Sequence, residues 1–327
     1  MSDRLRGTDL TLGYEGRTVT EGLSIDIPDG SFTVIVGPNA CGKSTLLRSL
    51  ARVLRPKAGT VLLDGRDIAT RPAREVARTL GLLAQTATAP DGITVADLVS
   101  RGRYPHRGPL STWSAADERA VRWAMQATSV TPLASAFVDE LSGGQRQRVW
   151  IAMVLAQQTP LLLLDEPTTY LDIAHQLDIL ELCATLHREH GRTLVAVLHD
   201  LNLAARYATH LVAMRAGRIV AAGPPSDVVT ESMMEQVFAL PCRVVPDPET
   251  GTALVIPRRR ASAGGACGGA GAVRAGRQAG YRRGVHTTGA APSRSSRRVC
   301  DEPMMSSVRM STSDGSRSAR RTTRTDS

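Results

Sequence analysis

A glycine-rich loop separates an apolar strand pattern from an apolar helix pattern near the N-terminus. The strand pattern is Phe32–Val36, and the helix pattern continues through Leu46, Leu47 and Leu50. The loop between them matches G-x-x-x-x-G-K-[ST], in which backbone N–H groups and the following helix N-terminus surround phosphate oxygens. We therefore expect a polyphosphate to bind at these nine residues: Gly37, Pro38, Asn39, Ala40, Cys41, Gly42, Lys43, Ser44 and Thr45.

The side chains of this loop suggest which atoms they bind. In the pattern, the lysine reaches the β- and γ-phosphates, and the hydroxyl that follows it binds Mg²⁺. We expect these two roles for Lys43 and Ser44.

Two acids follow a run of four leucines at residues 161–164. The run is too short for a helix and is typical of a buried parallel strand, and it ends in Asp165, Glu166 and Pro167. Ligands of doubly wound sheets bind at the carboxyl ends of the strands. We therefore expect Asp165 to hold Mg²⁺, directly or through water, and Glu166 to orient and deprotonate an attacking water.

Strand and helix patterns alternate along residues 1–257. Other strand patterns fall at residues 10–12, 23–27, 60–65, 79–83 and 193–198, and helix patterns at residues 144–157, 173–189 and 201–207. This alternation predicts an α/β fold with a parallel sheet covered by helices. Residues 86–135 indicate an insertion dominated by helix, in which we expect Trp113 and Trp123 to belong mainly to a core.

A second signature precedes the helix pattern at residues 144–157. The string Leu141-Ser142-Gly143-Gly144-Gln145 places a hydroxyl and flexible glycines at a helix N-terminus, which suits anionic oxygens. Together with the loop and the two acids, in this order and at this spacing, it resembles the nucleotide-binding subunit of ABC transporters over residues 5–257. The resemblance implies a P-loop NTPase core, an antiparallel β subdomain and a helical insertion, with ATP and Mg²⁺ bound and ATP hydrolysis coupled to transport.

The resemblance also assigns roles to four separate residues. Tyr14 looks like the aromatic residue that stacks on adenine, and Gln85 like the glutamine that contacts Mg²⁺ and water. Asp172 looks like the acid that communicates between paired subunits, and His199 like the histidine that touches the γ-phosphate. Each position has a plainer alternative: a surface tyrosine, a polar loop residue, a helix N-cap and a structural histidine.

One chain carries one set of these motifs. In the family, two subunits pair head to tail, and the signature of one caps ATP on the phosphate loop of the other. The resemblance therefore implies a homodimer, or a closely similar partner, with Ser142, Gly143, Gly144 and Gln145 acting across the interface.

Three stretches resemble the iron–siderophore importer branch of the family: residues 94–106, 171–180 and 198–207, the first of which ends in Tyr104-Pro105-His106. The resemblance implies import of a ferric siderophore through a separate membrane permease, with a substrate-binding protein. Vitamin B12 and haem importers share much of this branch, so the same role for another cargo stays open. A non-transport ABC ATPase is the remaining alternative.

Charge and composition divide the chain into two parts. Of the net charge of +9, residues 258–327 contribute +11, from 15 Arg and four acids, and residues 1–257 contribute −2. We expect the first part to fold without binding nucleic acid, and the tail to be disordered. A solvated tail without function is favoured over one that binds nucleic acid or anionic lipid.

The apolar pattern indicates where in the cell the protein acts, and the cysteine spacing excludes two kinds of structural site. No apolar run approaches 18 residues, and Met1-Ser2-Asp3-Arg4 lacks an apolar signal core. We therefore expect a peripheral protein at the cytoplasmic face of the cell membrane. The five cysteines are widely spaced and suit neither a disulfide scaffold nor a zinc site.

Overall fold

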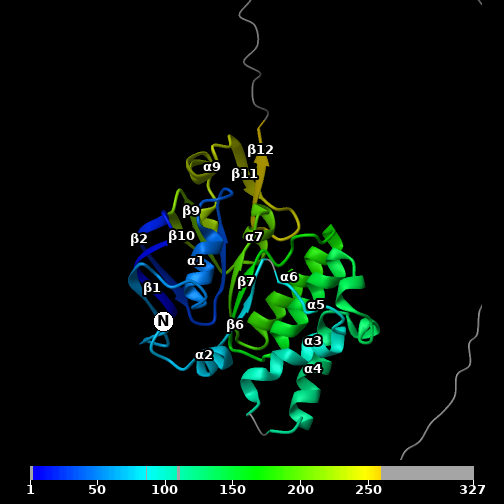
Figure 1. Cartoon of the computed structure of the whole chain (residues 1–327). Helices are drawn as coiled ribbons and strands as arrows, with labels where there is room; N and C mark the ends of the chain where they lie inside the picture. Colours follow the sequence, from blue (N-terminus) through cyan, green and yellow to red (C-terminus); the bar gives the residue numbers. More distant parts are fainter. Residues whose placement is uncertain (1–2, 86, 109–110, 259–327) are drawn as a thin grey trace, which may run out of the picture. The chain divides into compact units, whose positions relative to one another are not determined.

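The computed structural model describes residues 3–85, 87–108 and 111–258 (Figure 1). The tail that we expect to be disordered lies outside these residues, except for Arg258. No helix within the described ranges is long and apolar enough to cross a membrane.

A six-stranded sheet forms the centre of the fold, with strand order β10-β9-β3-β8-β7-β6. Its strands are β3 (Phe32–Val36), β6 (Leu80–Leu83), β7 (Leu161–Asp165), β8 (Thr193–Val197), β9 (His210–Arg215) and β10 (Arg218–Gly223). The five strands from β9 to β6 are parallel, and β10 pairs antiparallel at one edge. The predicted parallel sheet is thus confirmed, with an antiparallel edge strand that the sequence patterns did not indicate.

An antiparallel sheet of order β2-β1-β4-β5 stands beside it. Its strands are β1 (Asp3–Tyr14), β2 (Arg17–Pro28), β4 (Ala58–Leu63) and β5 (Arg66–Asp67). This sheet is the antiparallel subdomain that the family resemblance implies. A separate hairpin joins β11 (Cys242–Pro246) to β12 (Ala253–Pro257).

The central sheet buries both of its faces. Along β7 every side chain is buried, and alternate leucines point to opposite faces, as in any strand. Leu161 and Leu163 pack with α1 (Lys43–Leu50) and the antiparallel sheet, whereas Leu162 and Leu164 pack with the helices of the other face. Those helices include α5 (Gly143–Ala156), α6 (Ile173–Arg188) and α7 (Leu201–Tyr207). A strand covered on both sides can therefore be uniformly apolar.

Helices dominate the insertion, as the sequence indicates. They are α3 (Val95–Ser100), η1 (Arg101–His106), α4 (Ala115–Ala127) and η2 (Thr131–Leu133), followed by η3 (Val138–Glu140). Both α3 and α4 pack on α5, away from β1 and β2 (Figure 1). The expectation for Trp113 is wrong: it is 38% exposed, because its ring lies against Arg107 and its indole N–H donates to Glu118. Trp123 is partly buried against the core.

Several short elements have no counterpart in the sequence patterns. They are α2 (Ala73–Thr79), α8 (Pro225–Val228), α9 (Glu231–Phe238) and the strands β5, β9, β10, β11 and β12. Most of them lie after residue 208, where apolar runs are brief and lack a clear period.

A buried ion pair fixes the insertion internally. Arg103 Nε lies 2.9 Å from Asp117 Oδ1, and the two side chains are 6% and 7% exposed. We expect Asp117→Ala to lower the free energy of unfolding by about 3–5 kcal/mol, because the Arg103 charge is left buried without its partner. Urea unfolding at pH 7 measures this loss. Arg122→Ala, which breaks an exposed pair with Glu118, is the control and should change stability far less.

The same pair gives the expected loss a pH dependence. A hydrogen bond from Ser114 and the Arg103 guanidinium lower the pKa of Asp117 from 3.8 to about 2. A carboxylate with a lowered folded-state pKa stabilises the fold above its unfolded pKa and stops doing so as the pH falls through its folded pKa. The stability difference between wild type and Asp117→Ala should therefore shrink between about pH 4 and pH 2. A difference that stays constant over this window would contradict the assignment.

Candidate active site

A cavity of about 440 Å³ opens at the carboxyl ends of the central strands. Ten of the residues predicted from the sequence line it: Tyr14, Asn39, Ala40, Gly42, Lys43, Ser44, Thr45, Gln85, Glu166 and His199. They come from the end of β1, the loop after β3, the start of α1 and the segments that follow β6, β7 and β8. Topology thus brings together residues separated by up to 185 positions in the sequence, at the edge where parallel sheets bind ligands.

Two further lining residues, Arg17 and Val19, were not predicted. They lie at the start of β2, directly across the hairpin turn from Tyr14, which pairs with Arg17. The signal that could have identified them is the two-residue turn after Tyr14, since it returns the next strand to the same place. Tyr14 is 45% exposed, and its hydroxyl accepts a hydrogen bond from Arg48 at 3.3 Å.

The loop between β3 and α1 curls around the Lys43 ammonium group. Lys43 is 5% exposed, and its Nζ donates to the carbonyl oxygens of Gly37 at 2.8 Å and Pro38 at 2.9 Å. Gly37 has φ +155°, and a Cβ there would lie 2.2 Å from the Met214 carbonyl oxygen, so no side chain fits. The free thiol of Cys41 is buried beside Gly37 and does not line the cavity.

Ser44 lines the cavity and joins it to Asp165, which is buried behind Ser44 and does not line the cavity itself. The Ser44 hydroxyl donates to Asp165 Oδ1 at 2.8 Å, and Asp165 is 1% exposed. Its second oxygen, Oδ2, is buried and has no hydrogen-bond partner within the part of the chain that the structure describes. Burial raises the pKa of Asp165. A hydroxyl beside an unpartnered carboxylate oxygen is an oxygen donor set that fits Mg²⁺.

Glu166 follows Asp165 and turns its carboxylate toward the cavity. His199 Nε2 lies 2.8 Å from its Oε1, and Thr169 Oγ1 donates to Oε2 at 3.2 Å. Burial alone would raise the pKa of Glu166, but the hydrogen bond and charge of His199, with hydrogen bonds from Thr169 and Gln85, lower it below its usual value. The carboxylate is therefore ionised at neutral pH and able to accept a proton.

The backbone at Glu166 is strained. Its φ is +55°, a left-handed conformation that is uncommon for a residue with a side chain and costs about 1–3 kcal/mol. Such conformations gather at functional sites, where the surrounding structure holds them. Thr169, whose hydroxyl holds the carboxylate, was not predicted; its position three residues after Glu166 is the only signal in the sequence.

The second signature lies outside this cavity. Ser142 is the N-cap of α5: its Oγ accepts from the Gln145 N–H at 3.3 Å, and Gln145 Oε1 accepts from the Ser142 N–H at 3.0 Å. Gly143 and Gly144 lie next to residues 170 and 171. Asp172 is the N-cap of α6, so its plainer role is present in the structure. None of these five residues lines the cavity.

Comparison with known proteins places this arrangement in a family. A family model described as ABC transporter matches residues 20–169. The chain is 59% identical over 257 residues to the ferric enterobactin transport ATP-binding protein FepC of Escherichia coli (strain K12), covering 79% of this chain and 95% of that protein. It is 52% identical over 249 residues to the achromobactin transport ATP-binding protein CbrD of Dickeya dadantii (strain 3937), covering 76% and 93%.

A solved structure agrees with these relatives. The dimeric structure of MJ0796, a bacterial ABC transporter cassette, superposes with a TM-score of 0.62 at 26% identity, covering 67% of this chain and 98% of that one. The phosphate loop and the carboxylate pair both lie within residues 20–169, which the family model matches. The chain therefore belongs to the ABC transporter family and carries that family's ATPase domain.

Proposed function

We propose that this protein is the ATP-hydrolysing subunit of a ferric siderophore importer, with residues 5–257 as its ATP-binding domain. The observation that carries the ATPase role is the Glu166 carboxylate, 2.8 Å from His199 Nε2 in the cavity that Lys43 and Ser44 line. The names of the relatives support siderophore transport as the process it drives. Such a subunit would act at the cytoplasmic face of the membrane, on a separate permease and with a substrate-binding protein.

The residues of the cavity divide the chemistry among themselves. Tyr14 would stack on the adenine, and residues 37–45 would surround the phosphates, with the Lys43 ammonium at the β- and γ-phosphates. Ser44 and Asp165, with Gln85, would hold Mg²⁺, which neutralises charge on the β- and γ-phosphate oxygens when bound. Glu166 would accept the proton of the attacking water, and His199 would contact the γ-phosphate and orient Glu166.

The site would be completed by a second copy of the chain. The turn at residues 142–145 lies outside the cavity, although its helix N-terminus suits phosphate oxygens. The Ser142 oxygen already accepts the Gln145 N–H, so its own O–H proton is left to donate. A head-to-tail homodimer would place this donor and Asp172 over the nucleotide of the partner.

Ser142→Ala tests this shared site. The substitution is made in the Glu166→Gln chain, which should not hydrolyse ATP. We expect Ser142→Ala to weaken ATP-dependent dimerisation by about tenfold or more, since one hydrogen bond to a charged group is lost. ATP binding to the monomer should stay within about twofold. Sedimentation velocity with and without ATP measures the first, and titration with a fluorescent ATP analogue the second.

The matched control is Thr230→Ala, which removes the N-cap of α9, far from the signature in sequence. Both variants should lose about 1 kcal/mol of stability. Equal dimerisation of the two variants, or loss of monomer binding by Ser142→Ala alone, would refute the shared site.

Cargo is tested by growth. A strain that lacks this gene should fail on a ferric siderophore as its only iron source and recover with the wild-type gene. The same strain supplied with haem, or made dependent on added vitamin B12, tests the two other cargoes of this branch. If the strain grows normally on siderophores and fails to grow only on haem or vitamin B12, that compound is the cargo instead, and the proposed ATPase role is unaffected.

A further inference from the structure

The 3₁₀ helix η1 includes Tyr104-Pro105-His106, a motif to which the ATP site assigns no role. It contacts two helices, one connected to the signature turn at residues 142–145 and the other to the strand before Gln85. One is α5, whose first turn carries the signature, and the other is α2, which runs into β6 and then Gln85. Tyr104 itself is 58% exposed, so the contacts come from its neighbours.

Close backbone packing and two side-chain donors join η1 to the C-terminal end of α5. A Cβ on Gly102 would lie 2.2 Å from the Met153 carbonyl oxygen, so the backbones approach at a distance that only glycine permits. Arg103 Nη1 and His106 Nε2 donate to carbonyl oxygens at the end of α5, at 2.8 and 2.7 Å. A displacement of η1 therefore carries α5 with it.

Two arginines of α2 hold the opposite side of η1. The Pro105 carbonyl oxygen accepts from Arg74 Nε at 2.8 Å and from Arg78 Nε at 2.7 Å, which occupies both of its lone pairs. Arg74 also donates to the carbonyl oxygen of Arg107. Among the seven residues of α2 only Val76 is buried, so apolar packing does little to place this helix and its polar contacts matter more.

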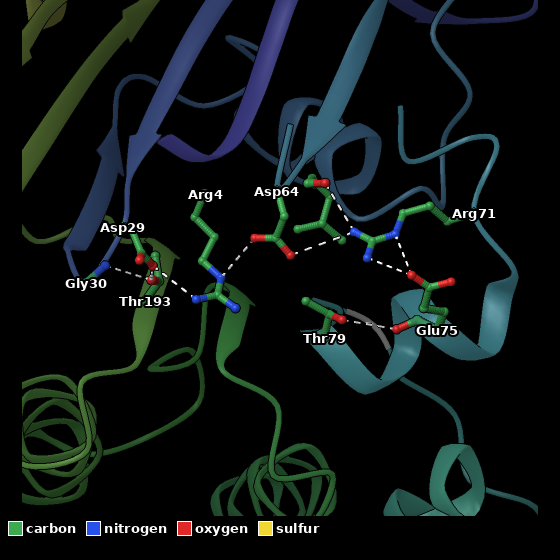
Figure 2. Close-up of polar contacts among 9 residues, drawn as sticks. Arg4, Asp29, Gly30, Asp64, Arg71, Glu75, Thr79 and Thr193 are labelled. Atoms are coloured by element: carbon green, nitrogen blue, oxygen red, sulfur yellow. Dashed lines mark hydrogen bonds and ion pairs between the residues drawn. The ribbon is translucent and has the colours of Figure 1, made fainter. Parts of the chain in front are cut away.

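The start of α2 is anchored to the antiparallel sheet. Figure 2 shows Arg71 between Asp64 and Glu75: its Nη2 lies 2.7 Å from Glu75, and its Nη1 donates to the Leu63 carbonyl at 3.1 Å. At its other end α2 continues into β6 without a loop, and Gln85 follows β6 by two residues. The helix therefore has a fixed place relative to the sheets and to Gln85, from which it can hold η1.

We propose that Arg74 and Arg78 are positioning residues of the ATPase. Through the Pro105 carbonyl they hold η1, and so add to the direct packing of α5 on β6 in placing the turn at residues 142–145 relative to the strand that leads to Gln85. The inference rests on the proposed two-chain ATP site, since only there does the placement of the signature affect hydrolysis. Loss of both arginines would leave the nucleotide cavity intact and let the signature take up several positions.

The test is the double variant Arg74→Gln/Arg78→Gln in the full chain. We expect kcat for ATP hydrolysis to fall about tenfold, because misplacement of a catalytic group by a fraction of an ångström is costly, while monomer ATP affinity stays within about twofold. The control is Arg119→Gln/Arg122→Gln on α4, which removes the same charge from exposed positions of the insertion. Arg78→Lys in the Arg74→Gln chain restores one donor and should recover part of the rate.

A distance measurement separates positioning from simple stabilisation. Spin labels go on Glu21→Cys of β2 and Gln126→Cys of α4, both exposed, in a chain whose Cys267 and Cys300 are serine. The three described native cysteines are buried. All chains also carry Glu166→Gln, and the distance between the two labels is measured with ATP bound. Its distribution should be narrow in the parent and in the α4 control, and broad in Arg74→Gln/Arg78→Gln.

A lower kcat together with the broad distribution supports the inference. An unchanged kcat, or a fall in melting temperature with a narrow distribution, overturns it and makes the two arginines structural contacts only. If the parent chain itself neither hydrolyses ATP nor dimerises with it, the proposed function fails, which is a different result.

Discussion

Glu166→Gln should lower kcat for ATP hydrolysis by about 100-fold or more and leave ATP binding within about twofold, since a positioned general base contributes about 10²–10⁴ to a rate. The structure explains why the two effects separate. The Glu166 carboxylate faces the cavity and has a lowered pKa, yet it is not part of residues 37–45, which would hold the phosphates. Glutamine keeps one oxygen for the contact with His199, and its NH₂ group can donate to the Thr169 hydroxyl, but it cannot accept a proton at neutral pH.

The rate is measured as phosphate release under saturating ATP, and binding with a fluorescent ATP analogue. The variant should also accumulate an ATP-bound dimer, because closure no longer ends in hydrolysis. Glu249→Gln, an exposed glutamate between β11 and β12, makes the same chemical change outside the site and should match wild type. Hydrolysis at the wild-type rate by Glu166→Gln would show that this carboxylate is not the base.

Lys43→Ala should weaken ATP binding by about 100-fold and abolish measurable hydrolysis, since hydrogen bonds from a charged donor are worth about 1.5–3 kcal/mol each. Lys43 is buried, and its ammonium group also offsets the partial negative charge of the Gly37 and Pro38 carbonyl oxygens, to which it donates. Without it these oxygens turn the loop into a poorer site for an anion. The loss therefore falls on binding as well as on turnover.

The chain supplies its own control, because its second lysine lies on the surface. Lys57 is exposed and donates to the Arg17 carbonyl at 3.3 Å. Lys57→Ala should bind ATP within about twofold of wild type, as surface substitutions usually do. Equal affinity of the two alanine variants would contradict the role of Lys43, and circular dichroism of both excludes loss of the fold as the cause.

The local elements of the fold were predictable because each has a strong pattern of its own. The strand Phe32–Val36 and the helix Leu201–Tyr207 have the predicted bounds, and the four leucines of β7 form the buried parallel strand that their composition indicates. The Gly-rich loop and the acids after β7 are likewise runs of consecutive residues, so their chemistry could be predicted from the sequence. Their roles in ATP hydrolysis remain predictions that the variants above test.

The features that could not be predicted from the sequence depend on contacts between distant segments of the chain. Arg74 and Pro105 are 31 residues apart and His106 and Gln157 are 51 apart, so no local pattern connects them. The exposure of Trp113 follows from Arg107 and Glu118, which offer its ring and its N–H partners at the surface. The positive φ of Glu166 is likewise imposed by tertiary structure against the residue's own preference.

Uptake of radiolabelled ferric siderophore by iron-starved cells tests the central claim most directly. The strain lacking this gene is complemented with wild type or with Glu166→Gln at equal expression. Our account predicts uptake with wild type and background uptake with the variant, because the motor binds ATP but cannot complete its cycle. Equal uptake in the two strains would contradict the claim that ATP hydrolysis by this protein drives siderophore import.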